Sequence, residues 1–433
     1  MNVLLLLLVF ALIPQGEDLR ELSGLSQEDA ASTTDTDSFD PLNPQFKKLL
    51  YRTGTVDSAV IREWVTNEST EAISSFATNP ADHRFHPVSI DAKVKSIRRF
   101  DYPPEQARNF LSGFYVADCE NEKGESFALI SRSSVASWPV KQSLEEPQSI
   151  RFDGFFFASK SVALIGETDS TPIPILVTRR FSWHPERTYA ELGVDAAKVA
   201  LANSGVDISL LDIVKSRKGK SIGSRETVCF WQMLAASKNV RLPADVDRVD
   251  FSTMLRSPIE SVGSAASVQG RVRQCVPVKV SDPEAVSLLG TDTWYQLTIF
   301  PDLKGRPIQV ATRDGEHEVY QNAFPVTVCV LNLPAGLNQE SIVGNVFLCD
   351  GFFYRIWAYP SERTDDSGLY GQPSPLVMAS SLTEIESTAG QLQTMLGAML
   401  LAMAIAIGFV GWFVFRSKKA VTRDELPDKI DTW

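Results

Sequence analysis

The sequence predicts an α+β protein that is mainly β: two duplicated modules of five to six strands, a short helical region between them, and one transmembrane helix. Two observations carry this prediction. A phrase of Asp-Gly followed by three aromatic residues occurs twice, and a charge-free apolar segment lies near the C-terminus. The two copies of the phrase run from Asp153 through Gly154, Phe155 and Phe156 to Phe157, and from Asp350 through Gly351, Phe352 and Phe353 to Tyr354.

The surroundings of the two phrases indicate that a whole β-rich unit is repeated. Short motifs recur around both copies in the same order, and such repeats decide how a fold is interpreted. They pair Ala92–Lys95 with Gly270–Arg273, Phe114-Tyr115 with Trp294-Tyr295, Gly124 with Gly305, Arg132 with Arg313, and Pro172–Ile175 with Pro373–Leu376. Strand and turn signals that all β proteins reuse are the alternative explanation.

The repeated phrase itself is interpreted as a turn that leads into a core strand. Glycine adopts positive φ without a Cβ penalty, and aspartate hydrogen-bonds the local backbone, so Asp-Gly is typical of turns. Three aromatic residues in a row favour a strand that is buried on both faces. Each buried aromatic side chain contributes about 1.5–3 kcal/mol. A surface on which a ligand stacks is the alternative.

Composition bounds the class of protein. The 433 residues suffice for two or three domains, and 44% hydrophobic with 22% charged residues is the balance of a globular chain. The formal net charge of −11 argues against nucleic acid and against anionic lipid surfaces as main partners. We therefore expect no nucleic acid among the partners.

The N-terminal part is expected to be a secretion signal followed by a solvated segment. Residues 1–16 contain a continuous apolar run with the length of a signal-peptide core, too short to span a bilayer. Residues 17–45 are rich in Ser, Thr, Asp and Glu, which predicts a disordered acidic linker. Residues 46–84 show helical spacing, and we expect this helical lead-in to pack on the edge of the first module.

The apolar segment 394–415 predicts a transmembrane helix that anchors the chain in a lipid bilayer. Its 22 residues carry no formal charge, and at about 1.5 Å per residue they span a hydrocarbon core of about 30 Å. Basic residues open the tail 416–433, whereas the juxtamembrane stretch 381–393 has none. The tail is therefore expected in the cytoplasm and the bulk outside. The spacing of the small residues Ala404 and Gly408 also allows a homodimer through this helix.

Module 1 spans residues 85–181 and contains five strand-like stretches. Each is rich in β-branched and aromatic residues, and turn signals such as Asn121–Gly124 separate them. The expected strands are Val88–Ile97, Phe114–Cys119, Ser126–Ser131, Ile150–Ala158 and Ile173–Thr178.

A helical connector over residues 182–245 separates module 1 from module 2, which spans residues 246–380. Helical spacing in the connector covers Val194–Ala202, Ile208–Lys215 and a third helix after Ser224. Module 2 repeats the strand pattern of module 1 with one further stretch. Its expected strands are Ala266–Val280, Thr293–Phe300, Pro307–Thr312, Val326–Leu331, Asn345–Trp357 and Leu376–Ala379.

The layout of each module resembles the OB-fold. A long first strand, about five strands in all and an insertion between the third and fourth strands are shared features. Gly270 lies inside the first strand of module 2, where such barrels bend. The resemblance implies two small closed barrels and covers about half of the chain; a β-sandwich is the alternative.

Chemical motifs are weak, so we expect neither an enzyme nor a bound cofactor or metal. Gly219–Gly223 fits the Gly-x-Ser-x-Gly pattern of a nucleophile elbow, but polar and basic residues precede it where a buried strand is required. His83 and His86 have no third ligand nearby in the sequence. The five cysteines allow at most two disulfides and are equally compatible with buried thiols. They are Cys119, Cys229, Cys275, Cys329 and Cys349.

These observations predict a membrane-anchored extracytoplasmic interaction or scaffold protein, such as an accessory subunit of an envelope complex that holds a protein partner. Arg132 and Arg313 follow what aligns as the third strand of each module and are the candidate partner contacts; a structural salt bridge is the alternative. An oligosaccharide-binding module is the second functional hypothesis. A sugar site needs exposed aromatic side chains, so burial of Trp138, Trp183, Trp294 and Trp357 would count against it.

Overall fold

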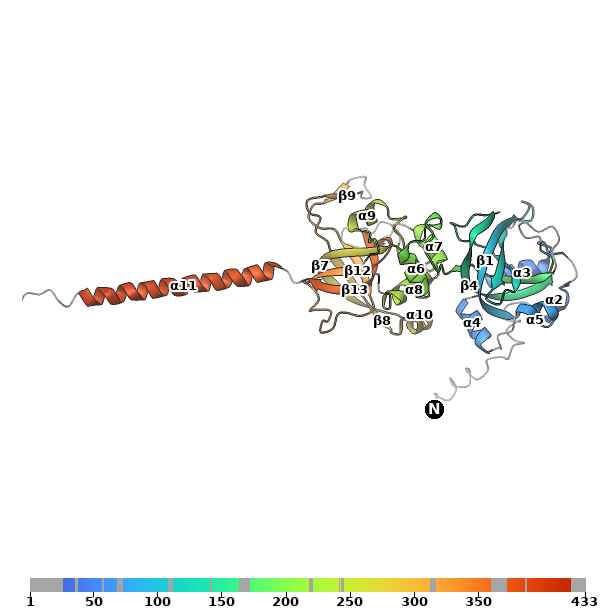
Figure 1. Ribbon diagram of the computed structural model, residues 1–433, viewed down its shortest axis with the longest axis horizontal. Coiled ribbons are helices and arrows are strands. Elements are labelled where there is room, and N and C mark those ends of the chain that lie inside the picture. The colour runs from blue at the N-terminus through green and yellow to red at the C-terminus, as the bar shows by residue number, and fades with distance from the viewer. Residues whose placement is uncertain are drawn as a thin grey trace, which may run out of the picture.

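The computed structural model places the parts of the protein in a row (Figure 1). The C-terminal helix stands at one end, followed by a barrel, a layer of short helices and another barrel. Strand residues exceed helix residues, so the mainly β fold class is confirmed. The structure describes residues 26–35, 38–56, 58–67, 73–107, 112–140, 142–162, 172–217, 221–240, 242, 245–311, 317–359, 372–385 and 388–421.

The first barrel is a sheet that closes on itself. Its strand order is β1-β2-β3-β5-β4-β6, and β1 also pairs with β4, which completes the ring. β3 and β5 run parallel, whereas the other neighbours in the ring run antiparallel. The strands are β1 (Pro87–Asp101), β2 (Gly113–Asn121), β3 (Ser126–Ser131), β4 (Gln142–Lys160), β5 (Ile173–Thr178) and β6 (Ser182–Trp183).

The second barrel repeats this plan strand for strand. It closes in the order β11-β13-β12-β7-β8, and its third and fifth strands, β11 and β13, are again the parallel pair. The ring consists of β7 (Ala265–Lys279), β8 (Thr293–Phe300), β11 (Val326–Val330), β12 (Val346–Tyr359) and β13 (Gln372–Ile385). The predicted OB-like barrel is therefore confirmed over the sandwich alternative.

One predicted barrel strand belongs elsewhere. The stretch Pro307–Thr312 was expected in the second barrel, but β9 (Ile308–Ala311) pairs only with β10 (His317–Tyr320) in the described chain. These two strands form a hairpin inserted between β8 and β11. Strand chemistry in the sequence does not reveal which partner a strand takes, so this insertion could not be distinguished from a ring strand.

Both copies of the Asp-Gly phrase lie inside the fourth strand of their barrel, at equivalent register. The prediction of a turn is wrong, because neither Gly154 nor Gly351 adopts a positive φ. A Cβ on Gly154 would lie 2.3 Å from the carbonyl oxygen of Val177, and one on Gly351 would lie 2.0 Å from that of Met378. The close approach of the fifth strand therefore requires glycine at both positions.

The helices before the first barrel include part of the segment that was expected to be disordered. α2 (Gln27–Ala31) begins with a capping box between Ser26 and Asp29. Asp29 also forms an ion pair of 2.7 Å with Lys48. The disorder expected over residues 17–45 is corrected for the described part, since its acidic side chains have partners that composition does not reveal. Residues 1–25, with the predicted signal peptide, lie outside the described residues.

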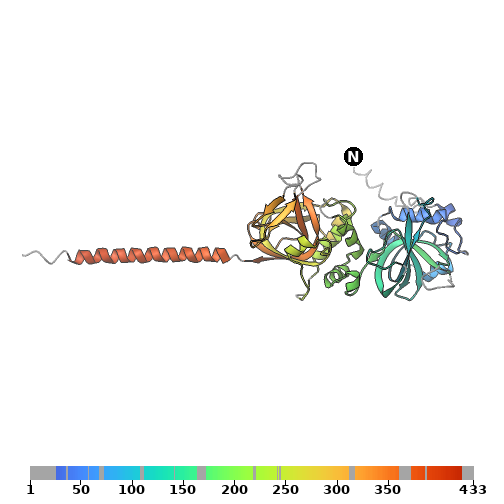
Figure 2. The ribbon, with the colours of Figure 1, turned by 90° about the horizontal axis from the view of Figure 1, so that it is seen from above.

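The remaining helices flank the two barrels. α3 (Pro44–Thr53), α4 (Ser58–Asn67) and α5 (Ile73–Thr78) precede β1, and the connector contains α6 (Ala196–Asn203), α7 (Leu211–Lys215) and α8 (Thr227–Ser237). Figure 2 shows the connector helices between the two barrels. Two short helices were not predicted, namely α9 (Phe251–Arg256) before β7 and α10 (Pro283–Leu289) between β7 and β8.

Helix α3 packs on the outer face of the first barrel, and Phe46 provides its aromatic contacts. The ring of Phe46 in α3 lies 5.2 Å from that of Phe114 in β2 and 5.5 Å from that of Phe157 in β4, measured between centroids. Because side chains alternate along a strand, Phe156 points the other way, into the barrel. There it stacks at 4.8 Å on Phe76 of α5.

The second copy has the same arrangement of aromatic rings. Phe230 of α8 lies 5.6 Å from Trp294 in β8 and 5.7 Å from Tyr354 in β12. These three residues hold the same positions as the aromatic trio on the outer face of the first barrel. The repeated unit therefore includes a packed helix as well as the barrel that sequence analysis recognised.

Buried apolar side chains link the parts into one body. A continuous cluster contains Phe156 inside the first barrel, Leu234 in the connector, and Tyr354 and Met378 on the outer face of the second barrel. A second cluster lies under α3 and α4, and a third fills the second barrel. Because interiors pack at high density, this shared core holds the two barrels in a fixed relation.

The C-terminal helix α11 (Thr388–Val421) begins soon after β13 ends. Its segment Gly397–Arg416 has a mean hydropathy of 2.4, and none of it is buried. The helix is long and apolar enough to cross a membrane, as predicted for segment 394–415, although it starts earlier than expected. The final residues 422–433 lie outside the described residues.

Candidate functional site

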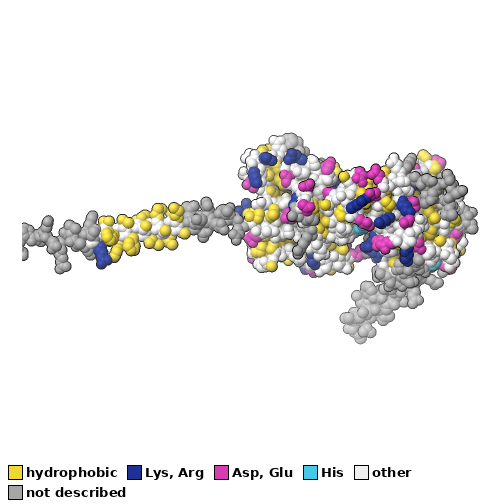
Figure 3. Space-filling view, viewed as in Figure 1, with side chains coloured by type: hydrophobic (Ala, Val, Ile, Leu, Met, Phe, Trp, Pro, Cys, Tyr) yellow, Lys and Arg dark blue, Asp and Glu magenta, His cyan; other side chains and the backbone are white. Residues whose placement is uncertain are grey.

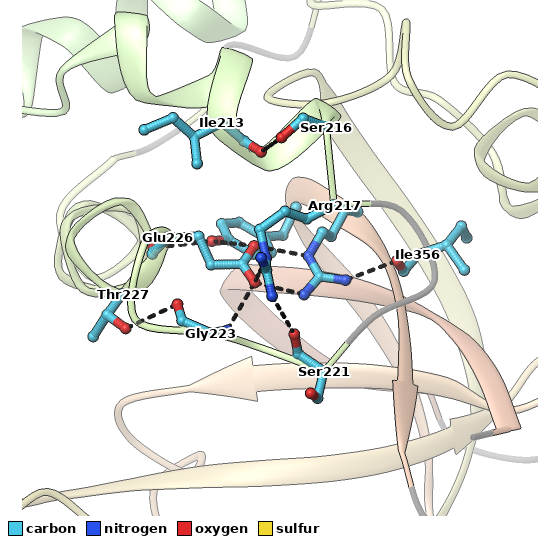
Figure 4. A network of polar contacts seen from close by, with 10 residues as sticks. Ile213, Ser216, Arg217, Ser221, Gly223, Glu226, Thr227 and Ile356 are labelled. Carbon is cyan, nitrogen blue, oxygen red and sulfur yellow. Dashed lines mark hydrogen bonds and ion pairs between the residues drawn. The ribbon is translucent and has the colours of Figure 1, made fainter. Parts of the chain in front are cut away.

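Glu226, the residue before α8, is the centre of a buried polar network (Figure 4). Arg355 of β12 donates to both of its carboxylate oxygens, at 2.9 and 2.8 Å. Arg217 donates to one of the same oxygens at 3.1 Å, and the Gly223 N–H does so at 3.0 Å. The side chains of Glu226 and Arg355 are 0% and 2% exposed. This network joins the connector to the second barrel with buried charges that are all hydrogen-bonded.

The Gly-x-Ser-x-Gly string belongs to this network. Helix α7 rather than a strand precedes it, and residues 218–220 lie outside the described residues. The Ser221 carbonyl oxygen accepts a hydrogen bond of 3.5 Å from Arg217. A Cβ on Gly223 would lie 2.6 Å from the Arg217 guanidinium, so glycine leaves room for that side chain. The described part of the string thus folds around Glu226.

Asp207 joins the connector to the first barrel in a similar way. Its carboxylate accepts hydrogen bonds from Arg180 at 2.7 Å and from the Trp183 N–H at 2.9 Å. Its own N–H donates to Gln232 of α8 at 3.0 Å. Asp207 is 1% exposed, and its oxygens also accept from Ser209. A fully hydrogen-bonded carboxylate therefore stands at each end of the connector.

The two predicted contact residues do not follow equivalent strands in the chain. Arg132 follows β3, and its guanidinium would lie 3.0 Å from a Cβ on Gly54, at the end of α3. Arg313 lies outside the described residues, between the strands of the β9–β10 hairpin. The third strand of the second barrel is β11, which Leu331 follows, so the alignment of Arg313 with Arg132 is wrong. The turn at Gly305 resembles the turn at Gly124, which misled the alignment.

A groove of about 1230 Å³ lies at one end of the second barrel. β7, α9, the loop after β8 and the base of the β9–β10 hairpin line it. We call it the basic groove, because five cations but only two carboxylates line it. Figure 3 shows dark blue side chains near the β9 corner of this barrel. The cations are Arg256, Arg271, Arg273, Lys304 and Arg306.

The two carboxylates of the groove are engaged in local structure. Asp250 caps α9 by accepting a hydrogen bond of 2.7 Å from the Thr253 N–H. The hydrogen bonds from Thr253, helped by two arginines of the groove, hold the pKa of Asp250 below its usual value. Asp302 accepts a hydrogen bond of 2.9 Å from the Lys304 N–H and so shapes the loop after β8. Neither carboxylate forms an ion pair with a groove cation in the described chain, which leaves the groove positive.

Comparison of the two barrels shows that this charge is specific to the second copy. Lys93 in β1 and Arg271 in β7 occupy the same place, one residue before the bulge in each strand. Lys93 lies opposite Glu120, whose carboxylate forms an ion pair with Lys95. Arg271 lies instead opposite Phe300. The second copy therefore has the cations without the carboxylate.

Sequence reasoning noticed part of the groove without recognising it. Gly270–Arg273 was singled out only as a landmark of the repeat. A Cβ on Gly270 would lie 2.7 Å from the Phe300 carbonyl group, so the expected bend is a close approach of two strands. The available signal was the pairing of this landmark with Ala92–Lys95, combined with the absence of a counterpart to Glu120.

Other chemical possibilities find no site in the described residues. No group of three or more His, Cys, Asp or Glu side chains that the structure describes could hold a metal ion. All five cysteines are described and are free thiols. Burial raises the pKa of every one of these thiols, which keeps them protonated and poorly nucleophilic.

Neither a protein-family model nor a curated protein matches the chain. Among solved structures, the chain is similar to the wild-type single-stranded DNA binding protein from Thermus aquaticus. The two share 8% identity over 70% of this chain and 95% of that chain, with a TM-score of 0.16. A deletion mutant of that protein shares 10% identity over 70% of this chain and 96% of that chain, with a TM-score of 0.15. A replication protein A heterotrimer bound to single-stranded DNA gives 8% identity over 71% of this chain and 51% of that chain, with a TM-score of 0.18.

These findings correct one expectation. Nucleic acid was excluded as a partner from the net charge of −11. That exclusion is withdrawn; the similar solved structures are of single-stranded DNA binding proteins, which is a property of those proteins and not of this chain. The physical reason is that a net charge averages over the whole surface, whereas binding depends on local potential. The basic groove is a positive region on a chain that is acidic overall.

Proposed function

We propose that the chain is a membrane-anchored interaction protein that holds a protein partner on a stiff arm of two barrels. The observation that carries the proposal is the continuous core, which runs from the first barrel through the connector to the outer face of the second. The helix that is apolar enough to span a membrane follows that barrel directly. An arm of this kind keeps a binding surface at a fixed distance from its anchor.

The polar contacts of the connector support a stiff arm. Asp207 binds the end of the first barrel, and Glu226 binds β12 of the second barrel. Breaking a buried ion pair by removing one partner costs about 3–5 kcal/mol. Bending the arm at the connector would require breaking contacts of this type together with the apolar packing around them.

The orientation of the anchor is also part of the proposal. Arg416 ends the apolar segment, and Lys418 and Lys419 follow it, whereas the opposite flank 381–393 has no basic residue. Cytoplasmic flanks of membrane helices carry the excess of Lys and Arg. The barrels then lie on the extracytoplasmic side and the tail in the cytoplasm.

Crosslinking in intact membranes tests the function. Photoreactive residues at Leu42 and Tyr51, which are 39% and 42% exposed near α3 of the first barrel, should capture a discrete protein partner. The same probe at Lys123, in an exposed turn, serves as the control. Orientation is tested with alkaline phosphatase, which should be active when fused at Ser380 and inactive at Trp433. Equal labelling at all three sites, or the reverse fusion pattern, would contradict the proposal.

The oligosaccharide hypothesis has less support. Trp138, Trp183 and Trp294 are only 3%, 3% and 6% exposed, and Trp357 is half-buried. The Trp357 ring N–H donates to the Thr327 hydroxyl at 3.0 Å, which turns its polar edge inward. A sugar-binding face needs several exposed aromatic side chains, and these four tryptophans do not supply one.

A further inference from the structure

We propose that the basic groove docks onto the anionic headgroup layer of the membrane in which α11 is anchored. The groove would bind the phosphate groups of anionic phospholipids and so hold the second barrel against the bilayer surface. This inference rests on the membrane anchoring proposed above and adds a second contact with the membrane. Three observations carry it: the position of the groove, its distance from the apolar segment, and the excess of cations over carboxylates in its lining.

The groove lies at the end of the barrel from which the chain runs to the membrane helix. Ile385, the last residue of β13, pairs with Val346 of β12. Val346 pairs in turn with Arg271, and Arg271 with Phe300. Val346, Arg271 and Phe300 all line the groove. At a strand spacing of about 4.8 Å, Arg271 lies about 10 Å from the point where the chain leaves the barrel.

The chain between the barrel and the bilayer is short. Eleven residues lie between Ile385 and Gly397, where the apolar segment begins, and the last nine of them belong to α11. The nine helical steps from Thr388 to Gly397 rise about 14 Å, and the three steps from Ile385 to Thr388 add at most about 11 Å. The headgroup layer takes up about 5–8 Å of that distance. The remaining gap is comparable with the length of an arginine side chain and a Debye length of about 8–10 Å.

The lining of the groove suits clustered phosphates. Four of its five cations are arginines, whose planar guanidinium groups bind phosphate through two parallel hydrogen bonds. The volume of about 1230 Å³ exceeds the range of about 300–1,000 Å³ that is usual for small-molecule sites. It accommodates several headgroups at once.

The first barrel provides an internal comparison. It stands away from α11 (Figure 1), and its equivalent cations face Glu120 and Glu186. In the second barrel, which lies next to the membrane helix, the equivalent residues Arg271 and Arg273 form no ion pair with a carboxylate in the described chain. This contrast favours the membrane surface over a soluble polyanion, since a soluble ligand would reach either barrel equally well.

Hydrogen exchange of the full chain in lipid nanodiscs tests the proposal. Discs of phosphatidylcholine alone are compared with discs that also contain phosphatidylglycerol. Backbone amides of residues 269–273 and 302–306 should exchange more slowly in the anionic discs, and high salt should abolish the difference. The variant R273Q/R306Q should shift the docking equilibrium about thirtyfold, at about fivefold for each cation near an anionic surface. The variant K123Q/K238Q, which removes two exposed cations elsewhere, should leave it unchanged.

The possible failures separate the two proposals. If the chain is not retained in either type of disc, the anchoring is wrong and the docking proposal falls with it. If the chain is retained but the groove exchanges equally in both discs, only the docking proposal is overturned. Protection in neutral discs by added polyglutamate or single-stranded DNA, at concentrations where anionic lipid gives none, would also overturn it. Exchange elsewhere in the second barrel reports whether each variant remains folded.

Discussion

Arg355 in β12 and Glu226 before α8 form a bidentate ion pair in the interior, with hydrogen bonds of 2.9 and 2.8 Å. The pair is absent from the first copy, where Ala158 holds the place of Arg355. Both charges are buried, so loss of either partner would leave the other charge without solvent or a counter-ion, which is unfavourable for the folded state.

Removing one partner of this pair should destabilise the fold strongly. We expect E226Q to lower the free energy of unfolding by about 3–5 kcal/mol, since the Arg355 charge would lose its counter-ion. The double variant E226M/R355M should recover much of that loss, because apolar side chains of similar length can replace a buried pair. Denaturant unfolding measures both, and K238Q, which alters an exposed side chain outside this network, is the control. A loss below about 1 kcal/mol in E226Q would show that the pair is not essential.

The glycines of the repeated phrase should not tolerate a side chain. In G154A and G351A, the new Cβ would approach a backbone carbonyl oxygen to 2.3 and 2.0 Å unless the strands separate. Overpacking of this kind costs about 1–3 kcal/mol or more. The measurement is the midpoint of thermal unfolding for each variant, compared with G397A, which meets no atom within 4 Å. Unchanged midpoints in both strand variants would refute the close-approach explanation.

Phe46 of α3 and Phe230 of α8 should contribute similar amounts to the free energy of unfolding. We expect F46A and F230A each to cost about 3–5 kcal/mol, the usual range for a buried phenylalanine. Both side chains are buried, at 0% and 3% exposure, and both contact two aromatic rings of their barrel. Tyr51, on the exposed side of α3, provides the control Y51A. If denaturant unfolding shows a loss of stability in only one of the two phenylalanine variants, the equivalence of α3 and α8 is contradicted.

Asp153 should make stability depend on pH in the sense opposite to most carboxylates. Burial raises the pKa of its carboxyl group, although a hydrogen bond from Ser89 opposes this. A raised pKa in the folded state means that the folded protein binds the proton more tightly, so stability is lost as pH rises through that pKa. The gain in stability of D153N over the wild type should therefore be larger at pH 7 than at pH 4.

Asp29 supplies the matched comparison for that experiment. The hydrogen bond from Lys48 lowers the pKa of Asp29, so its contribution is present at neutral pH and is lost as pH falls. D29N should therefore cost stability at pH 7 and have little effect in acid. If the stability difference from the wild type changes with pH in the same direction for D153N and D29N, the opposite pKa shifts of Asp153 and Asp29 are contradicted.

Much of the fold could be predicted because strand chemistry is local. β3, β5 and β8 have the predicted bounds, and the landmark Ala92–Lys95 occupies the same register as Gly270–Arg273. The function of Gly154 could not be predicted, because a glycine required by a neighbouring strand looks the same in sequence as one required by a turn. The displacement of Arg313 had a similar cause, since an inserted hairpin carries the same turn signals as the ring.

The candidate site was less accessible to sequence analysis than the fold. The basic groove combines cations from α9, β7 and the loop after β8, which come together only when the barrel closes. Its charge depends on Phe300 standing where Glu120 stands in the first copy, a comparison that requires strand register. The Glu226–Arg355 pair joins residues 129 positions apart, and no local pattern connects them.

The aromatic contact between Phe230 and the face of the second barrel determines where the protein can be divided. A fragment that starts at Ala265 would expose Trp294, Tyr354 and Met378 to water and should precipitate. A fragment that begins before α8, and so keeps this helix with its barrel, leaves the surface covered. The repeated structural unit is thus a helix together with the barrel it covers, and a fragment cut down to the strands alone would lack the helix that covers this apolar surface.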